Sequence, residues 1–88
     1  MDRQARLRRL RFRAWHRGIK EADLLVGGFF DRHGDECADA ELDWFEQILE
    51  EQDVDIIAWA TGTASPPARY EGAMMNRLQA LDYIKHPE

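Results

Sequence analysis

The apolar residues of this chain recur three and four positions apart along almost its whole length. In the first such segment, Leu7, Leu10 and Ala14 fall on one helix face. No stretch alternates apolar and polar residues over the length of a strand, as a half-buried β-strand would require. Helical spacing appears in five segments, over about 3–16, 18–32, 39–51, 53–61 and 67–84. We therefore expect an all-α fold, a compact bundle of five short antiparallel helices.

Glycine and acidic residues mark the expected helix ends. Gly18 separates the first two segments, and Asp53 and Asp39 stand where N-caps of later helices are expected. Gly27 and Gly28 lie together inside the second segment. Because glycine weakens a helix interior, the pair predicts a kink or an end to the regular part of that helix.

The length of 88 residues predicts one domain over 1–88, with a modest core and little room for an enclosed substrate cavity. Cys37 is the single cysteine, which excludes an intramolecular disulfide and suits a reducing compartment. No apolar run approaches the roughly 20 residues that span a membrane. No apolar stretch follows the arginine-rich start, as a secretory signal would require. We expect a cytoplasmic protein that does not bind membranes.

The net charge of −5 hides a sharp division. The first 20 residues hold eight basic and one acidic residue, and the other 68 hold four basic and sixteen acidic ones. Arg6, Arg9, Arg13 and Arg17 repeat on one face of the first helix. This stripe could pair internally with the acidic remainder or dock onto an acidic partner. Nucleic acid is disfavoured, because the acidic remainder would repel a polyanion.

Catalytic and metal-binding patterns are weak in this sequence. His16, His33 and His86 lie far apart and show no metal-ligand spacing. Cys37 lies in an acidic loop, which would raise the pKa of its thiol instead of activating it. We expect Cys37 to be a small, semi-buried residue without a chemical role. Paired acids in so small a domain are usually solvated faces or helix caps. We expect no metal, no cofactor and no enzymatic activity.

The run Arg17-Gly18-Ile19-Lys20-Glu21 has the sharpest local pattern. On a continuous helix, Arg17 and Glu21 would form an ordinary ion pair worth roughly 0.3–0.5 kcal/mol. A glycine between them argues against a continuous helix, because glycine costs helix stability. At a turn, Gly18 would instead let the backbone of a partner come close. The run therefore favours a small, flat, polar docking patch.

The pattern Arg17-Gly18-x-x-Glu21 resembles the RGxxE motif of the succinate dehydrogenase flavinylation factors, the SdhE type of bacteria. The resemblance covers about residues 6–62. Further segments in the order of that family are 11–23, 29–30, 42–50 and 53–59. Two departures affect helix ends: the segment 38–41 reads Ala-Asp-Ala-Glu where Ser-x-x-Glu is common, and Gly28 stands where proline is frequent.

The resemblance implies a five-helix factor that binds the flavoprotein subunit of succinate dehydrogenase and promotes its covalent attachment of FAD. The resemblance also allows the flavoprotein subunit of fumarate reductase as a second binding partner. Carried over to this chain, the motif assigns Arg17, Gly18 and Glu21 to the contact surface. Arg13 and Arg9, from the arginine stripe, are expected to bind the partner as well. The free protein is expected to be a monomer.

The large aromatic side chains are interpreted mostly as packing residues. They are Phe12, Trp44, Phe45 and Trp59. A competing interpretation, which rests only on the basic first helix, is an antitoxin-type or nucleic-acid-binding interaction protein. Co-purification with a flavoprotein or with nucleic acid would distinguish the two.

Overall fold

The helical spacing of the sequence is reproduced by the computed structural model, which describes residues 2–84. Its α-helices are α1 (Arg3–Trp15), α2 (Lys20–His33), α3 (Asp39–Leu49), α4 (Asp53–Thr61) and α5 (Ala73–Ala80). Two short 3₁₀ turns, η1 (Gly34–Glu36) and η2 (Ala68–Tyr70), lie between them. There is no β-strand between residues 2 and 84. The expected all-α fold with five helices is confirmed.

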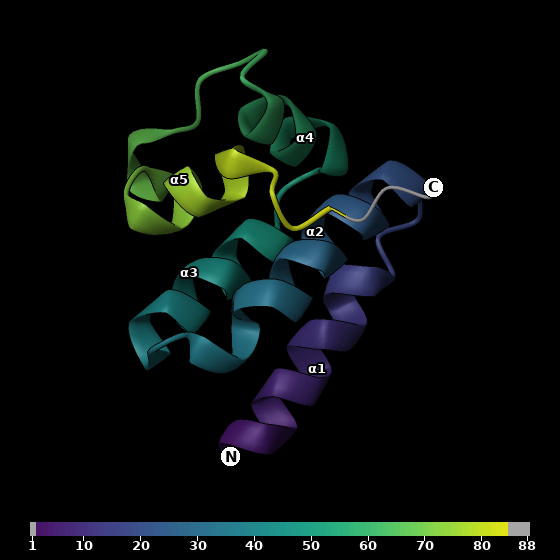
Figure 1. Ribbon diagram of the computed structural model, residues 1–88, viewed down its shortest axis with the longest axis vertical. Helices are drawn as coiled ribbons and strands as arrows, with labels where there is room; N and C mark the ends of the chain where they lie inside the picture. The colour runs from purple at the N-terminus through teal and green to yellow at the C-terminus, as the bar shows by residue number, and fades with distance from the viewer. Residues whose placement is uncertain (1, 85–88) are drawn as a thin grey trace.

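The five helices form two connected groups. Figure 1 shows α1, α2 and α3 together in the lower half of the view, with α4 and α5 above them. Helix α1 packs against α2 and α3, whereas α4 packs against α2 and α5. The turn from α1 to α2 and the turn from α3 to α4 are thereby brought into contact, as the hydrogen bonds below show.

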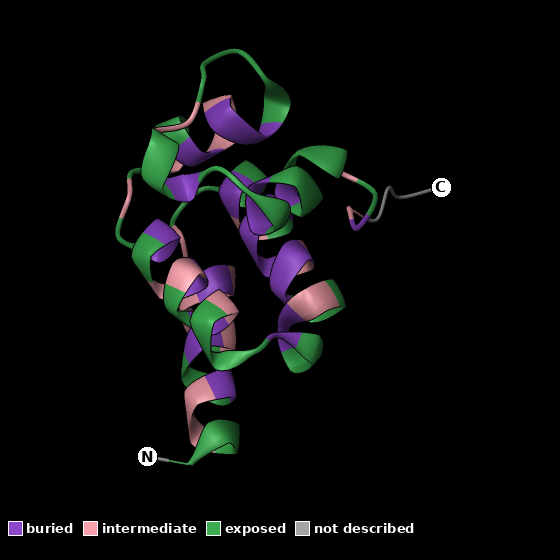
Figure 2. Ribbon diagram, turned by 90° about the vertical axis from the view of Figure 1, so that its left-hand side faces the viewer, coloured by how far each residue is buried: buried purple, intermediate pink, exposed green. Residues whose placement is uncertain are grey.

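A core rich in aromatic rings packs α2 against α3. The rings of Phe29 and Phe45 stack with centroids 5.9 Å apart, and Phe30 lies 4.9 Å from Phe45. All three side chains are almost fully buried. Figure 2 shows that buried residues face inward on each helix, while the loop after α4 is exposed. Aromatic pairs of this kind stabilise a core beyond the effect of their buried area.

Two helix starts differ from the expected caps by one residue, because Asp39 and Asp53 are the first helical residues of α3 and α4 and not their N-caps. Gln52 is the N-cap of α4, so that Asp53, expected at the cap, is the first helical residue. Helix α3 follows Ala38, whose amide donates to Glu41 Oε1 at 2.8 Å. This bond, together with Arg77, holds the pKa of Glu41 below its ordinary value. The glutamate of a capping box therefore accepts the amide of the N-cap residue here, although that residue is an alanine and not a serine.

The expected second and fifth helices are longer than the observed ones. Helix α2 begins at Lys20 instead of residue 18, because Gly18 has a φ of +107° that a right-handed helix does not allow. The segment expected as one helix over 67–84 is divided into η2 and α5 by Gly72, with φ +138°. Apolar spacing continues across these breaks, so periodicity alone did not locate them.

The glycine pair of α2 does not end the helix, which continues regularly to His33. The reason is a close contact with the indole of Trp15, at the end of α1. A Cβ atom at Gly27 would lie 2.3 Å from that ring, whereas one at Gly28 would lie 3.5 Å from the backbone oxygen of Tyr83. Gly27 is therefore required for the packing of α1 on α2, and Gly28 is not.

Gly27→Ala is expected to destabilise the fold, although alanine is the better helix former. The new methyl group would force Trp15 away from α2, and overpacking of this kind costs about 1–3 kcal/mol. Gly28→Ala is the matched control, with an expected gain of about 0.5–1 kcal/mol from helix propensity. Urea denaturation of both variants measures the difference, and equal stabilities would contradict the packing explanation.

Candidate docking site

The turn between α1 and α2 presents Gly18 to solvent. Gly18 has a φ of +107°, a left-handed conformation that side chains with a Cβ rarely adopt. No atom beyond its chain neighbours lies within 4 Å of the position where a Cβ would stand. The turn is therefore an open backbone surface, as expected from the sequence.

Glu21 lies in the first turn of α2, three residues after Gly18, and its side chain is exposed. A carboxylate at a helix start is favourable because of the helix dipole, so this residue fits its position without an internal partner. The structure thus brings the glycine and the carboxylate of the motif to one exposed corner of the molecule.

Arg17 differs from its two motif neighbours because its side chain is turned into the protein and is only 11% exposed. Its Nε donates to Asp53 Oδ1 at 2.7 Å, and its terminal nitrogens donate to the carbonyl oxygens of Leu49 and Glu51 at 2.8 and 3.0 Å. The intrahelical pair that a continuous helix would allow between Arg17 and Glu21 does not form, because Arg17 precedes α2. The sequence held no signal for these partners, which lie more than thirty positions away.

The arginine stripe on α1 faces the acidic residues of α3. Arg6 binds Asp43 and Glu46 at 2.6 and 2.7 Å, and these hydrogen bonds raise the pKa of its guanidinium. Arg13 forms an ion pair with Glu50. The interpretation of the stripe as a face paired with the acidic part of the chain is confirmed for these residues. The partner-binding roles of Arg13 and of the exposed Arg9 stay predictions.

The expectation that Phe12 is a packing residue is wrong. Its side chain is 63% exposed, and its ring stacks on His16 with centroids 3.9 Å apart. Phe12 lies two positions after Leu10, off the buried face of α1, so the periodicity could have placed it outside. The other aromatic residues agree with their interpretation: Phe45 and Trp59 are buried, and Trp44 packs partly buried against the core.

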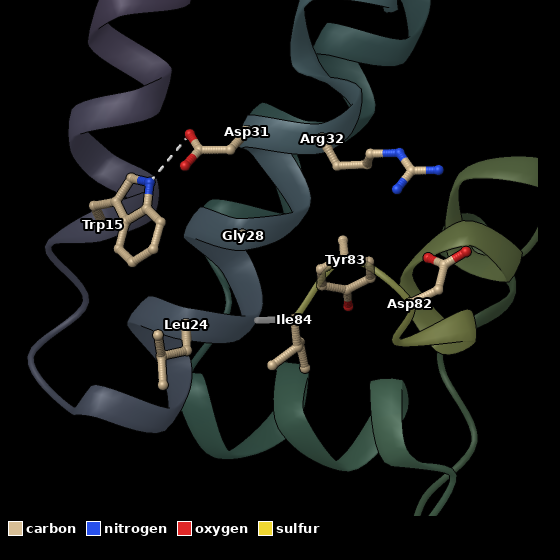
Figure 3. Close-up of a pocket in the computed structure, with 8 residues that line it drawn as sticks. All are labelled: Trp15, Leu24, Gly28, Asp31, Arg32, Asp82, Tyr83 and Ile84. Carbon is tan, nitrogen blue, oxygen red and sulfur yellow. Dashed lines mark hydrogen bonds between the residues drawn. The ribbon is translucent and has the colours of Figure 1, made fainter. Parts of the chain in front are cut away.

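A groove of about 540 Å³ opens beside the exposed face of α2. Trp15 and Asp31 face each other on one side of it, joined by a hydrogen bond of 3.2 Å, and Arg32 and Asp82 lie on the other side (Figure 3). Leu24, on its wall, stands three positions after Glu21 and therefore shares a helix face with that carboxylate. The residues that line the groove do not include Arg17, Gly18 or Glu21, so the flat patch predicted at the motif stays a prediction.

The other reactive side chains between residues 2 and 84 do not form a metal site. Burial raises the pKa of the Cys37 thiol, which donates to the backbone oxygen of His33. Burial also lowers the pKa of His33, whose Nε2 is buried and has no hydrogen-bond partner among residues 2–84. Within residues 2–84, no group of three or more histidine, cysteine or acidic side chains could hold a metal ion. His86 lies outside the described residues.

The comparisons with known proteins identify the family. The family profile described as "Flavinator of succinate dehydrogenase" matches residues 8–82, a range that includes Arg17, Gly18 and Glu21. The chain belongs to this family. The assignment to the flavinylation factors, made from the RGxxE motif and its flanking segments, is thereby confirmed.

Individual relatives agree with this family. The chain is 40% identical over 74 residues to the FAD assembly factor SdhE of Acetobacter pasteurianus, over 84% of this chain and 68% of that protein. It is 42% identical over 59 residues to the mitochondrial succinate dehydrogenase assembly factor 2 of Meyerozyma guilliermondii, over 67% and 44% of the two chains. The match to the Schizosaccharomyces pombe factor of the same name covers 52% of that protein, at 33% identity. The chain thus spans about half the length of these mitochondrial relatives.

None of the helices between residues 2 and 84 is both long and apolar enough to cross a bilayer.

Proposed function

We propose that this chain, as one domain, binds the flavoprotein subunit of succinate dehydrogenase and promotes the covalent attachment of FAD to that subunit. The observation that carries the proposal is the corner formed by Gly18 and Glu21 in a chain of the flavinator family. An open glycine backbone and an exposed carboxylate, beside an arginine whose side chain is 11% exposed, form a preorganised surface for another protein.

The contribution of the factor is positional in this proposal, and the chain is not itself an enzyme. The reacting groups, a histidine and the flavin, belong to the client. Holding two reacting groups in a productive geometry can by itself lower a barrier greatly, because the entropy of bringing them together is lost beforehand. A small factor can therefore accelerate flavin attachment without supplying a catalytic side chain.

The docking surface in this proposal consists of the exposed residues around the turn. Gly18 admits a backbone segment of the client, and Glu21 accepts hydrogen bonds from a basic or amide group there. Phe12, stacked on His16 and 63% exposed, adds an aromatic side chain on the outer face of α1. Exposed aromatic side chains often dominate binding energy at interfaces. We propose that the free protein is a cytoplasmic monomer that uses this surface for its client alone and does not bind nucleic acid.

Glu21→Ala is expected to weaken client binding about tenfold or more, since hydrogen bonds to a charged group contribute about 1.5–3 kcal/mol. The test is the covalent flavin content of the succinate dehydrogenase flavoprotein in cells that lack their own factor and carry each variant. Flavin fluorescence of the denatured subunit reports only covalently bound FAD. Glu71→Ala removes another exposed carboxylate, one outside the docking surface, and serves as the control.

Three outcomes of this experiment are informative. If the unmodified chain fails to restore covalent flavin, the proposed function is wrong. If the chain restores flavin and both glutamate variants do so equally, the function stands and Glu21 is removed from the docking surface. Recovery of nucleic acid with the purified protein, in place of the flavoprotein, would support the competing interpretation.

A further inference from the structure

One side chain, that of Arg17, joins three parts of the fold. The residue itself lies in the turn after α1. Its guanidinium reaches the carbonyl oxygens of Leu49 and Glu51 at the end of α3, at 2.8 and 3.0 Å, and the carboxylate of Asp53 at the start of α4, at 2.7 Å. These partners stand 32 to 36 positions along the chain from Arg17. The turn that carries Gly18 is therefore attached directly to the turn between α3 and α4.

The chemistry of these partners explains why an arginine suits this position. The last carbonyl groups of a helix have no partner within the helix and carry partial negative charge, so a cation at the end of α3 is stabilising. Asp53 lies at the start of α4, where the dipole favours a carboxylate. The planar guanidinium presents several N–H groups in fixed directions, so it can satisfy all three oxygens together.

Burial separates this arginine from those on α1. The Arg17 side chain is 11% exposed and that of Asp53 is 19% exposed, whereas the ion pair of Arg13 joins side chains that are 35% and 72% exposed. A buried pair is costly to break, because removing one member leaves an uncompensated charge. The backbone is fixed as well, since the Arg17 amide donates to Asp23 Oδ1 at 2.7 Å.

We infer that Arg17 and Asp53 form a positioning pair, in which Arg17 acts on docking through Asp53 and not through contact with the client. This inference rests on the proposed function and deepens it. The pair fixes the turn so that Gly18 keeps its left-handed conformation and Glu21 its place in the first turn of α2. Asp53, far from the motif in sequence, becomes part of the docking machinery.

The test is a double-mutant cycle with Arg17→Ala, Asp53→Ala and the double variant, measured by binding to the purified flavoprotein subunit. Each single variant is expected to bind about tenfold more weakly, and the double variant no more weakly than either, since residues in direct contact are strongly non-additive. If Arg17 contacts the client directly, Arg17→Ala binds weakly while Asp53→Ala binds normally, and the inference is overturned. Asp55→Ala, in the same first turn of α4, is the matched control and should bind normally.

Two further measurements separate positioning from general destabilisation. Arg17→Lys keeps the positive charge but cannot reach three oxygens in fixed directions, so it should bind as weakly as Arg17→Ala. Hydrogen exchange of Asp53→Asn should show faster exchange at the Arg17 amide, while amides of α5 keep their protection. Normal binding by Arg17→Lys, or unchanged exchange at Arg17, would overturn the positioning role. Because every comparison is made against an unmodified chain that binds, failure of that chain would instead count against the proposed function.

Discussion

Replacing Gly18 by arginine is expected to lower covalent flavin in the client to the level of cells that have no factor at all. The position of a Cβ at Gly18 is open to solvent, so the new side chain would project outward where the client backbone is proposed to lie. The φ of +107° adds local strain of about 1–3 kcal/mol for a residue with a Cβ. The core is untouched, because no core atom lies near that position.

The structure supplies a control with nearly the same backbone strain. Gly62, at the end of α4, has a φ of +84° and also has open space at its Cβ position. Gly62→Arg should therefore lose similar stability and keep full flavin content. Gly18→Ala separates strain from bulk, with an expected partial loss of flavin. Circular dichroism of the purified variants checks that each one is folded.

Full flavin content with Gly18→Arg would exclude the turn from the docking surface. Equal losses with Gly18→Arg and Gly62→Arg would show that instability, and not obstruction of the client, explains the effect. Either result would leave membership of the flavinator family intact and would move the docking surface elsewhere on the molecule.

Trp59→Ala is expected to lower the free energy of unfolding by about 3–5 kcal/mol, a large share of the stability of a small domain. The ring is 7% exposed and packs against Tyr70 with centroids 5.5 Å apart. Tyr70 in turn accepts a hydrogen bond from Trp44 through its backbone oxygen, at 3.0 Å. Removal of the indole therefore leaves a cavity at the centre of the contact between α4, η2 and α3.

Val54→Ala is the matched control on the same helix, because Val54 is 64% exposed. Its expected effect on stability is within about 0.5 kcal/mol. Urea denaturation measures both variants, and flavin content should fall for Trp59→Ala only in proportion to the unfolded fraction. A Trp59→Ala protein with normal stability but no client binding would place the indole in the interface instead of the core.

Gly27 and Gly28 show that helix propensity alone does not decide where a helix ends. Glycine weakens a helix interior, so a kink or an end of the helix is the expectation at Gly27 and Gly28, yet α2 continues through both to His33. The reason is the packing of Trp15, at the end of α1, whose indole covers Gly27. A local propensity of about 1 kcal/mol is easily overcome by the packing of an aromatic ring. The sequence contained both residues but did not indicate that they meet.

Phe12 and Trp59 show that the burial of an aromatic residue also depends on tertiary packing. Both are large aromatic residues in helical segments, and both were interpreted as packing residues. The buried face of α1 is already occupied by Leu7, Leu10 and Ala14, and this leaves Phe12 on the outer side. Trp59 lies on the face that α4 turns toward η2, and it is buried.

The sequence by itself determined the all-α class, the five helical segments, the family and the corner formed by Gly18 and Glu21. These features depend on spacing and on short motifs, which act between residues close in the chain. Only the tertiary structure decided that Arg17 turns inward to Asp53, 36 positions away, while Glu21 stays exposed. The physical reason is that an arginine forms hydrogen bonds with the oxygens that lie within its reach. Which oxygens lie there depends on how the helices pack around the core.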